Sequence, residues 1–345
     1  MWMNRRSTLI GVLPLILATI SWVVSTSAAE PLFEGDDVLD LTIHGPMTRL
    51  ARGTRGSTDV GGWLELADGQ KIQMTFSRYG ISRLRECGLP CFKITIAEED
   101  ARGTIFEGQS TLRLVTGCQY GSSYDRYILL EYLVYESFAV ITEPALQTRL
   151  VSCRFRDSEK PAFEEIGLAF FVEDIGLAAD RHGKTWLDIR SQRIADLDPA
   201  QLALLALFQF MVGNTDWSAL SSAAGQSCCH NVAVLGAEGD KHNRLLPFDF
   251  DQAGLVDAPY AAPDERLKIQ RVTQRVYRGY CTHNDELPAA IAVLNEKRRE
   301  LEELFDENAL PNPQARKRAL KYIDGFYDTI NNPRKMESRI ISECR

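Results

Sequence analysis

The feature that most constrains this chain is a stretch from 208 to 256 in which charged side chains interrupt or follow apolar segments. Residues 201–212 are apolar at helical spacing, and Asp216 comes just past the end of that predicted helix. Residues 245–250 predict a buried strand, and Asp249 places a charge inside it. A carboxylate there costs several kcal/mol unless a cation or hydrogen bonds compensate it. The fold must therefore supply those partners.

The oxygen-bearing side chains of this stretch suit a hard metal ion. Asn231 stands at the start of a second predicted strand, 232–235, and Asp251 follows Asp249 by two positions. Two aspartates and one asparagine amide are the ligands that Mg²⁺ between phosphates requires. The same residue types also cap helices and close turns. A calcium site without catalysis would use the same four residues, Asp216 included, so both interpretations stay open.

The order of these residues is that of the catalytic parts of protein kinases. There an aspartate takes up the acceptor hydroxyl, an asparagine holds one metal, and the aspartate of Asp-Phe-Gly holds the other. The spacing from Asp216 to Asn231 is far longer than the usual five residues, and Asp251 stands where glycine is usual after Asp249-Phe250. Atypical kinases tolerate both departures.

Four phrases carry a resemblance to a known family. They are GNTDW at 213–217, CCHN at 228–231, PFDFDQAGLV at 247–256 and VYRGYC at 276–281. They resemble the CotH (spore coat protein H) kinase family and, more closely, a group of uncharacterised secreted bacterial proteins related to it. The closer resemblance covers most of the chain after its N-terminal segment, whereas the kinase link depends mainly on three polar positions.

The resemblance implies an α+β fold of the two-lobed, atypical protein-kinase type. We expect a strand-rich N-terminal lobe over residues 30–175 and a mostly helical C-terminal lobe with the site over residues 176–345. It implies ATP with Mg²⁺ or Mn²⁺ as cofactors. Asp216 would orient the acceptor, Asn231 and Asp249 would bind the metal, and Asp251 would assist as a further ligand or a supporting residue.

A kinase-type site also requires a buried cation for the nucleotide phosphates, held by a carboxylate. Lys93 and Arg113, each within a predicted strand, are the candidates, and the resemblance favours Lys93. Glu131, within a predicted helix over 124–141, is the expected partner of Lys93. For either cation, an exposed position on one strand face is the alternative.

Two further candidate sites depend on less specific sequence patterns. Glu173 ends a predicted strand at 168–172 and would lie near ribose or adenine in a kinase-like arrangement, although an acidic turn is the more ordinary interpretation. Residues 52–57, RGTRGS, are rich in glycine but lack both known phosphate-loop spacings, which favours a surface loop.

The N-terminus predicts export. Residues 1–29 contain a basic start, an apolar run over 9–24 and a small-residue cleavage site before Glu30, as in a signal peptide. An uncleaved membrane anchor is the alternative, because the run is somewhat long. We therefore expect a periplasmic or extracellular protein.

The net charge limits the classes of binding partner, and the number of cysteines indicates the cellular compartment. The net charge is −8, and an acidic chain binds nucleic acid and anionic membranes poorly. We expect an unknown protein or small-molecule acceptor, no nucleic acid, and membrane contact only through an uncleaved N-terminal segment. Eight cysteines fit an oxidising compartment.

Some disulfide pairings can be weighed from the sequence. Adjacent residues lie about 3.8 Å apart across a trans peptide, below the usual disulfide range, so Cys228 and Cys229 are expected to pair elsewhere. Cys87 with Cys118 is plausible, and Cys281 could pair with Cys228 or Cys229.

The sequence leaves three functions open. The first is an exported phosphotransferase that uses ATP and a divalent metal. The second is a non-catalytic envelope or surface protein, which the scarcity of ATP outside the cytoplasm favours. The third transfers another part of the nucleotide, such as AMP. Fold analogy cannot choose among them.

Overall fold

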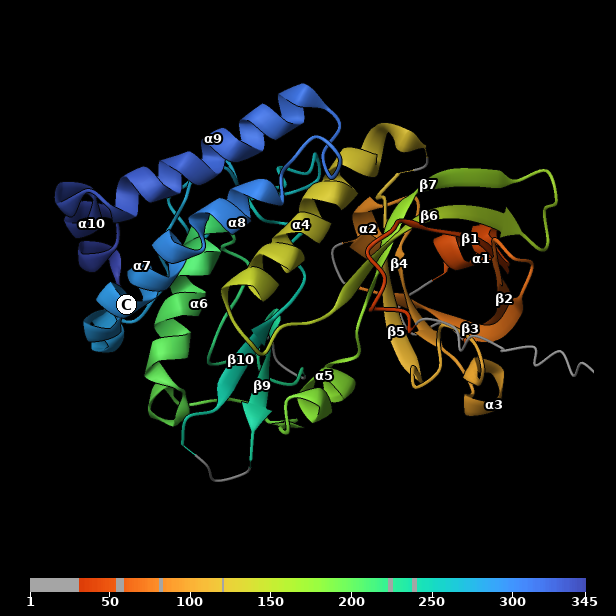
Figure 1. The fold of residues 1–345 in the computed structure, drawn as a ribbon, viewed down its shortest axis with the longest axis horizontal. Coiled ribbons are helices and arrows are strands. Elements are labelled where there is room, and N and C mark those ends of the chain that lie inside the picture. The colour runs from red at the N-terminus through yellow and green to blue at the C-terminus, as the bar shows by residue number, and fades with distance from the viewer. Residues whose placement is uncertain (1–30, 54–58, 81–82, 120, 223–225, 238–240) are drawn as a thin grey trace, which may run out of the picture.

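Seven strands of the first half of the chain form a closed barrel (Figure 1). The computed structural model describes residues 31–53, 59–80, 83–119, 121–222, 226–237 and 241–345. The barrel strands are β1 (Leu39–Gly45), β2 (Val60–Leu66), β3 (Lys71–Tyr79), β4 (Cys91–Thr95), β5 (Thr111–Thr116), β6 (Thr148–Asp157) and β7 (Glu164–Val172).

The barrel closes because β6 returns beside β1. These two strands pair in parallel from Leu39–Val151 to Gly45–Asp157, while β7 pairs antiparallel with both β5 and β6. Inward side chains alternate with outward ones along the strands and fill the interior. Phe76 and Phe92 meet edge to face there, with ring centroids 6.3 Å apart. Closure satisfies the backbone groups that an open sheet would leave at its edges.

The expected two-lobed kinase-like fold, with a strand-rich N-lobe and a helical C-lobe, is wrong. The strands close into a mixed seven-stranded barrel instead of that arrangement. The later part of the chain combines its helices with a three-stranded antiparallel sheet in the order β10–β9–β8. The sequence could not reveal the closure, because inward and outward residues alternate in the same way in an open sheet and in a barrel.

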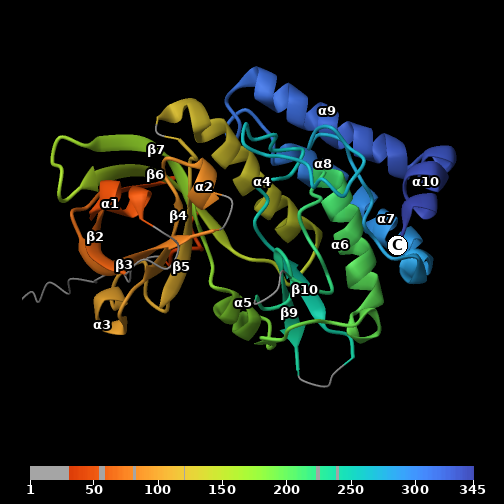
Figure 2. The same cartoon turned by 180° about the vertical axis from the view of Figure 1, so that it is seen from behind.

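Most of the helices and a three-stranded sheet lie beside the barrel (Figure 2). The sheet strands are β8 (Thr185–Trp186), β9 (Val232–Gly236) and β10 (Arg244–Pro247). The helices are α1 (Met47–Arg52), α2 (Arg83–Glu86), α3 (Glu98–Ala101), α4 (Asp125–Ile141), α5 (Ile175–Arg181), α6 (Pro199–Val212), α7 (Leu287–Glu296), α8 (Arg298–Glu303), α9 (Pro313–Ile330) and α10 (Pro333–Arg339).

Helix α6 sets the position of Asp216. The Asp198 side chain caps its start by accepting the Gln201 N–H at 3.0 Å. Every residue from Gln201 to Val212 is buried, so the helix is fixed in the core. Gly213 ends it in the left-handed region, with φ of 68°, where a side chain would be unfavourable. The chain then turns and presents Asp216 beyond the core.

Helix α4 connects the barrel to the remaining structure. Figure 1 shows it between the barrel and the C-terminal helices. On one side Tyr135 contacts Phe170 of the barrel, with ring centroids 5.6 Å apart. On the other, Phe138 contacts Phe208 of α6 at 4.8 Å. Because α4 is held from both sides, its polar residues have fixed positions.

Most predicted elements are confirmed, with two corrections. The helix predicted over 124–141 is present as α4, and residues 313–330, whose amphipathic pattern also predicts a helix, form α9. The amphipathic pattern of residues 285–305 predicts a single helix, but the structure has two there, α7 and α8, separated at Lys297. The strand predicted over 245–250 ends at Pro247, before Asp249. The expected targeting segment, residues 1–29, and residues 54–57 of the glycine-rich loop lie outside the described part of the chain.

The disulfide bonds confirm one pairing and correct two. Cys87–Cys118 is present, with Cα atoms 4.5 Å apart. The adjacent Cys228 and Cys229 pair with each other. Their peptide bond is cis and brings their Cα atoms to 2.9 Å, whereas the expectation assumed a trans peptide. The partner of Cys281 is Cys344.

The disulfides are compatible with an oxidising, exported environment. None of the helices in the described part of the chain combines the length and hydrophobicity that a bilayer crossing requires.

Candidate functional site

Asp216, His230 and Asn231 form a hydrogen-bonded cluster at the start of β9. The His230 Nε2 atom lies 2.7 Å from Asp216 Oδ1. The Asn231 Nδ2 atom donates to Asp216 Oδ2 at 3.1 Å and to the Asp216 carbonyl at 2.8 Å. The Asp216 side chain remains 43% exposed, so a ligand can reach it. The cluster fixes the carboxylate while leaving it open to solvent.

The pairing of β9 with β10 brings Asn231 and Asp249 to the same edge. Val232 pairs with Pro247, and the Phe248 N–H donates to the Asn231 carbonyl at 3.0 Å. Both Asn231 and Asp249 have positive φ, 54° and 62°, which is uncommon for residues other than glycine. Such conformations persist only where surrounding contacts determine them, and they cluster at functional sites.

The Asp249 backbone is held from the opposite side by α4, because its N–H donates to the hydroxyl of Tyr135 at 2.8 Å. The same tyrosine ring contacts Phe250 edge to face, with centroids 4.8 Å apart. Phe250 is fully buried. The turn that carries Asp249 is therefore fixed to the core on both sides of the carboxylate.

Arg83 is the central cation of a buried network below this turn. Its Nη2 atom donates to Glu131 at 2.5 Å, and its Nε atom donates to Asp251 at 3.0 Å. Its Nη1 atom donates to the Thr116 carbonyl at 2.8 Å, and the guanidinium lies 5.7 Å from the centroid of the Tyr260 ring. Arg83 is 4% exposed. Arg83 therefore compensates the buried charges of Glu131 on α4 and Asp251 in the 249–251 turn.

The buried region holds more acids than cations. Burial raises the pKa of Glu131 to about 7, although the Arg83 charge opposes this. Burial, followed by the charges of Asp251 and Glu131, raises the pKa of Asp249 well above its ordinary value. The three acids are Glu131, Asp249 and Asp251, whereas the region contains two cations, Arg83 and Arg113. A bound cation near Asp249 would restore the balance.

Arg113 has an unused hydrogen-bond donor. It is 8% exposed, and its guanidinium lies 4.7 Å from the centroid of the Phe248 ring. Its Nη1 atom donates to the Tyr79 hydroxyl at 3.5 Å, but Nη2 is buried and has no partner in the described part of the chain. Arg113 and Asp249 line the same small cavity, of about 20 Å³. A buried donor without an acceptor costs about 1–3 kcal/mol, so an anionic oxygen would be stabilising there.

The other predicted cation, Lys93, does not line this cavity. Lys93 pairs across the sheet with Arg113 but is exposed. The expected ion pair between Lys93 and Glu131 is therefore wrong, because Glu131 pairs with Arg83. Alternation along β4 turns Phe92 and Ile94 inward and Lys93 outward.

Glu173 is engaged by structural partners. Its two oxygens accept hydrogen bonds from Arg181 at 3.0 and 2.6 Å, and one of them also accepts the Gln147 N–H at 3.0 Å. It does not belong to the lining of the cavity. The contacts tie β7 to α5, and its predicted place beside ribose or adenine stays a prediction.

Sequence reasoning missed Arg83, Tyr135 and His230 as site residues. Tyr135 could have been found, because it lies four positions after Glu131 and therefore on the same helix face. His230 directly precedes Asn231 and could have been weighed with it. No sequence pattern indicated Arg83, because it lies on the short helix α2, 48 positions before Glu131 and 168 before Asp251.

Two of the metal ligands expected from the sequence remain available to an ion. Asp251 is bound to Arg83, which leaves Asp249 and the Asn231 amide oxygen as hard donors. The described residues contain no group of three or more His, Cys, Asp or Glu side chains placed to hold a metal. Mg²⁺ is commonly bound by one or two carboxylates and substrate phosphates rather than by an all-protein cage. The donors therefore suit an ion that arrives with phosphates.

The Asp216–His230 contact predicts a pH-dependent stability. The hydrogen bond to Asp216 raises the pKa of His230 above 6.5, although burial opposes it. The stabilisation is therefore fully present below the unfolded value and is lost as the pH rises through the folded value. Urea unfolding at about pH 6 and about pH 8.5 should show a larger loss for His230→Gln at the lower pH. An equal loss at both would contradict a charged contact.

No protein-family model matches the chain, and no curated protein matches its sequence.

Proposed function

We propose that the cavity beside Arg113, together with the cluster at Asp216, is a phosphoryl-transfer site for ATP and a divalent metal. Arg113 would bind a phosphate oxygen. Asp249 and Asn231 would hold Mg²⁺ or Mn²⁺, and Asp216 would orient the hydroxyl of the acceptor. The proposal depends on the chemistry of these residues and not on a kinase fold.

One observation carries the proposal: two opposite charge requirements meet in one cavity. Asp249 lies in a buried region with two other acids, Asp251 and Glu131, so a cation would stabilise its ionised form. Arg113 Nη2 is a buried donor without a partner in the described residues and needs an anion. Both line the same cavity. A phosphate group accompanied by a divalent cation meets both requirements, whereas either ion alone meets one.

The residues around the cavity suit the reaction. A bound metal would neutralise charge on the phosphate oxygens. The acceptor oxygen would form a bond to the γ-phosphorus as the bond from that phosphorus to the bridging oxygen breaks, and ADP would leave. Asp216 Oδ1 or Oδ2 would take the hydroxyl proton. Because His230 and Asn231 hold this carboxylate, it needs little reorganisation during transfer.

A second candidate function is supported by the size of the cavity. About 20 Å³ is room for a group the size of a water molecule or an ion, so most of a nucleotide would extend beyond the rim. The same volume suits a non-catalytic, exported protein that binds Ca²⁺ at Asp249. For either function we propose export to the periplasm or the cell exterior, with the acceptor a protein or a small molecule.

A thermal melt separates these functions. At about a hundred times the dissociation constant, ATP with Mn²⁺ should add roughly 2.7 kcal/mol to the stability of the native protein. The shift should be lost in Asp249→Asn and in Arg113→Gln, because each removes one of the two complementary charges. It should persist in Asp188→Asn, which removes an exposed carboxylate from a loop outside the site.

Two outcomes of the melt would contradict the phosphoryl-transfer proposal. One is an unchanged melting temperature of the wild-type protein with ATP and Mn²⁺ at millimolar concentration. The other is a shift of equal size with Ca²⁺ alone, lost in Asp249→Asn but kept in Arg113→Gln, which would support the non-catalytic ion site.

A further inference from the structure

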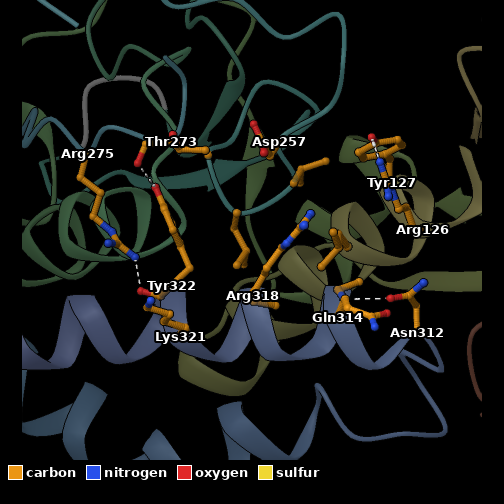
Figure 3. A pocket seen from close by; sticks show the side chains of 16 residues that line it. Arg126, Tyr127, Asp257, Thr273, Arg275, Asn312, Gln314, Arg318, Lys321 and Tyr322 are labelled. Carbon is orange, nitrogen blue, oxygen red and sulfur yellow. Dashed lines mark hydrogen bonds between the residues drawn. The ribbon is translucent and has the colours of Figure 1, made fainter. Parts of the chain in front are cut away.

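A separate groove of about 720 Å³ lies between the start of α4, the first half of α9 and the segment 254–257 (Figure 3). Such a volume is within the range of about 300–1,000 Å³ that is usual for small-molecule sites. None of the residues proposed for phosphoryl transfer lines it. Its ligand chemistry can therefore be derived independently.

The open side of the groove carries positive charge. Arg126 of α4 and both Arg318 and Lys321 of α9 line it and are exposed. Asp257 is its one acidic lining residue in the described chain. Burial raises the pKa of Asp257, and the charges of Arg318 and Arg126 oppose this, so both guanidinium groups act on the same space. Figure 3 shows Arg318 extending from α9 into the groove toward the Asp257 segment.

The stability of α9 does not account for these cations. Arg318 and Lys321 are three positions apart and lie on one helix face. The ion pairs of α9 in the described part of the chain are made by Asp324 and Asp328, and not by these two cations. In a chain with a net charge of −8, this local excess of positive charge attracts anions.

The back wall of the groove is fixed by Arg275 and Tyr322. The Arg275 guanidinium lies over the Tyr322 ring, 3.6 Å from its centroid, and donates to the carbonyls of Tyr322 at 2.5 Å and Met211 at 3.0 Å. The Tyr322 hydroxyl donates to the Thr273 carbonyl at 3.2 Å. Arg275 is therefore engaged within the protein, and it gives the groove a rigid aromatic wall.

The floor of the groove is apolar. Leu130 and Val256 are buried beneath it, and two small residues of α9, Ala315 and Ala319, leave space between helix and segment. Tyr127 adds an aromatic ring on the α4 side of the groove. The Arg126 guanidinium lies over this ring, 4.5 Å from the ring centroid. A ligand here would meet apolar surface below and cations above.

We propose that this groove binds an organic anion with an apolar body, the anionic group contacting Arg318 and Arg126. Inorganic phosphate alone would forgo the apolar floor, and a neutral aromatic would forgo the cations. Phenyl phosphate combines both features and is the probe. Its two halves, phosphate and phenol, are the comparison compounds.

Isothermal titration calorimetry on the full chain tests the proposal. Phenyl phosphate should bind saturably, and at least about tenfold more tightly than either half, since each tenfold corresponds to about 1.4 kcal/mol. Arg318→Gln should weaken binding about tenfold, because it removes a charge-assisted contact. Ala315→Trp should also weaken it by filling the groove. Lys317→Gln, an exposed cation of the same helix that does not line the groove, should have no effect.

A further control variant tests whether phenyl phosphate binds instead in the cavity beside Arg113. Arg113→Gln should leave the affinity for phenyl phosphate unchanged. Binding that is lost in Arg113→Gln and kept in Arg318→Gln would overturn the groove assignment. So would equal affinities for phosphate and phenyl phosphate, or no saturable binding to the wild-type protein at millimolar concentration.

Discussion

Replacing Arg83 with methionine should destabilise the protein by about 3–5 kcal/mol, because it leaves Glu131 and Asp251 buried without their cation. Methionine keeps most of the side-chain length, so the effect reports the loss of charge and hydrogen bonds more than the loss of volume. Urea unfolding of the oxidised protein measures it. The loss should be larger at about pH 8 than at about pH 5, because protonation relieves uncompensated carboxylates.

Two comparison variants make the Arg83 result specific. Lys93→Met removes an exposed cation from the neighbouring strand β4 and should change stability by less than about 0.5 kcal/mol. Adding Glu131→Gln and Asp251→Asn to Arg83→Met should recover a large part of the loss, since the two acids that Arg83 compensated are then neutral. A small effect of Arg83→Met, or no recovery in the triple variant, would show that the network is not needed for folding.

Replacing Asp216 with asparagine should reduce phosphoryl transfer by about 10²–10⁴-fold, the usual contribution of a positioned general base. Asparagine keeps one of the two acceptor oxygens that His230 and Asn231 contact, but it cannot take up a proton. Because Asp216 is outside the phosphate cavity, the affinity for ATP with Mn²⁺ should stay within about twofold. Release of inorganic phosphate, with water as the acceptor, allows the measurement without the natural acceptor.

The outcome for Asp216 is judged against Asp188→Asn, which removes an exposed carboxylate elsewhere and should retain wild-type turnover. If Asp216→Asn retained the full rate while Asp249→Asn lost nucleotide binding, the chain would bind nucleotide but Asp216 would have no catalytic role. Loss of binding in Asp216→Asn itself would place this residue among the ligands of the metal.

Part of the site followed from local sequence rules. Asp216 was predicted to follow a buried helix, and the cap at Asp198 and the left-handed Gly213 are local reasons why α6 ends there. Asn231 was predicted at the start of a strand, which is where it lies. Asp249 was predicted inside a strand, but the strand ends at Pro247, because the left-handed φ of Asp249 cannot continue it.

Most helices and strands, both ends of α6, and the order in which the polar residues follow buried segments could be predicted from the amino-acid sequence. These are set by hydrophobic periodicity and by capping, which act within a few residues. Tertiary structure decided the closure of the barrel, because the parallel pairing of β1 with β6 joins residues more than a hundred positions apart.

Tertiary structure also decided which cation meets Glu131. Lys93 and Arg83 are both within about fifty positions of it, yet of the two only Arg83 is buried in contact with it, whereas Lys93 is exposed on β4. A buried charge is tolerated wherever a partner of opposite sign is brought to it, and the choice of partner is made by three-dimensional packing rather than by local sequence.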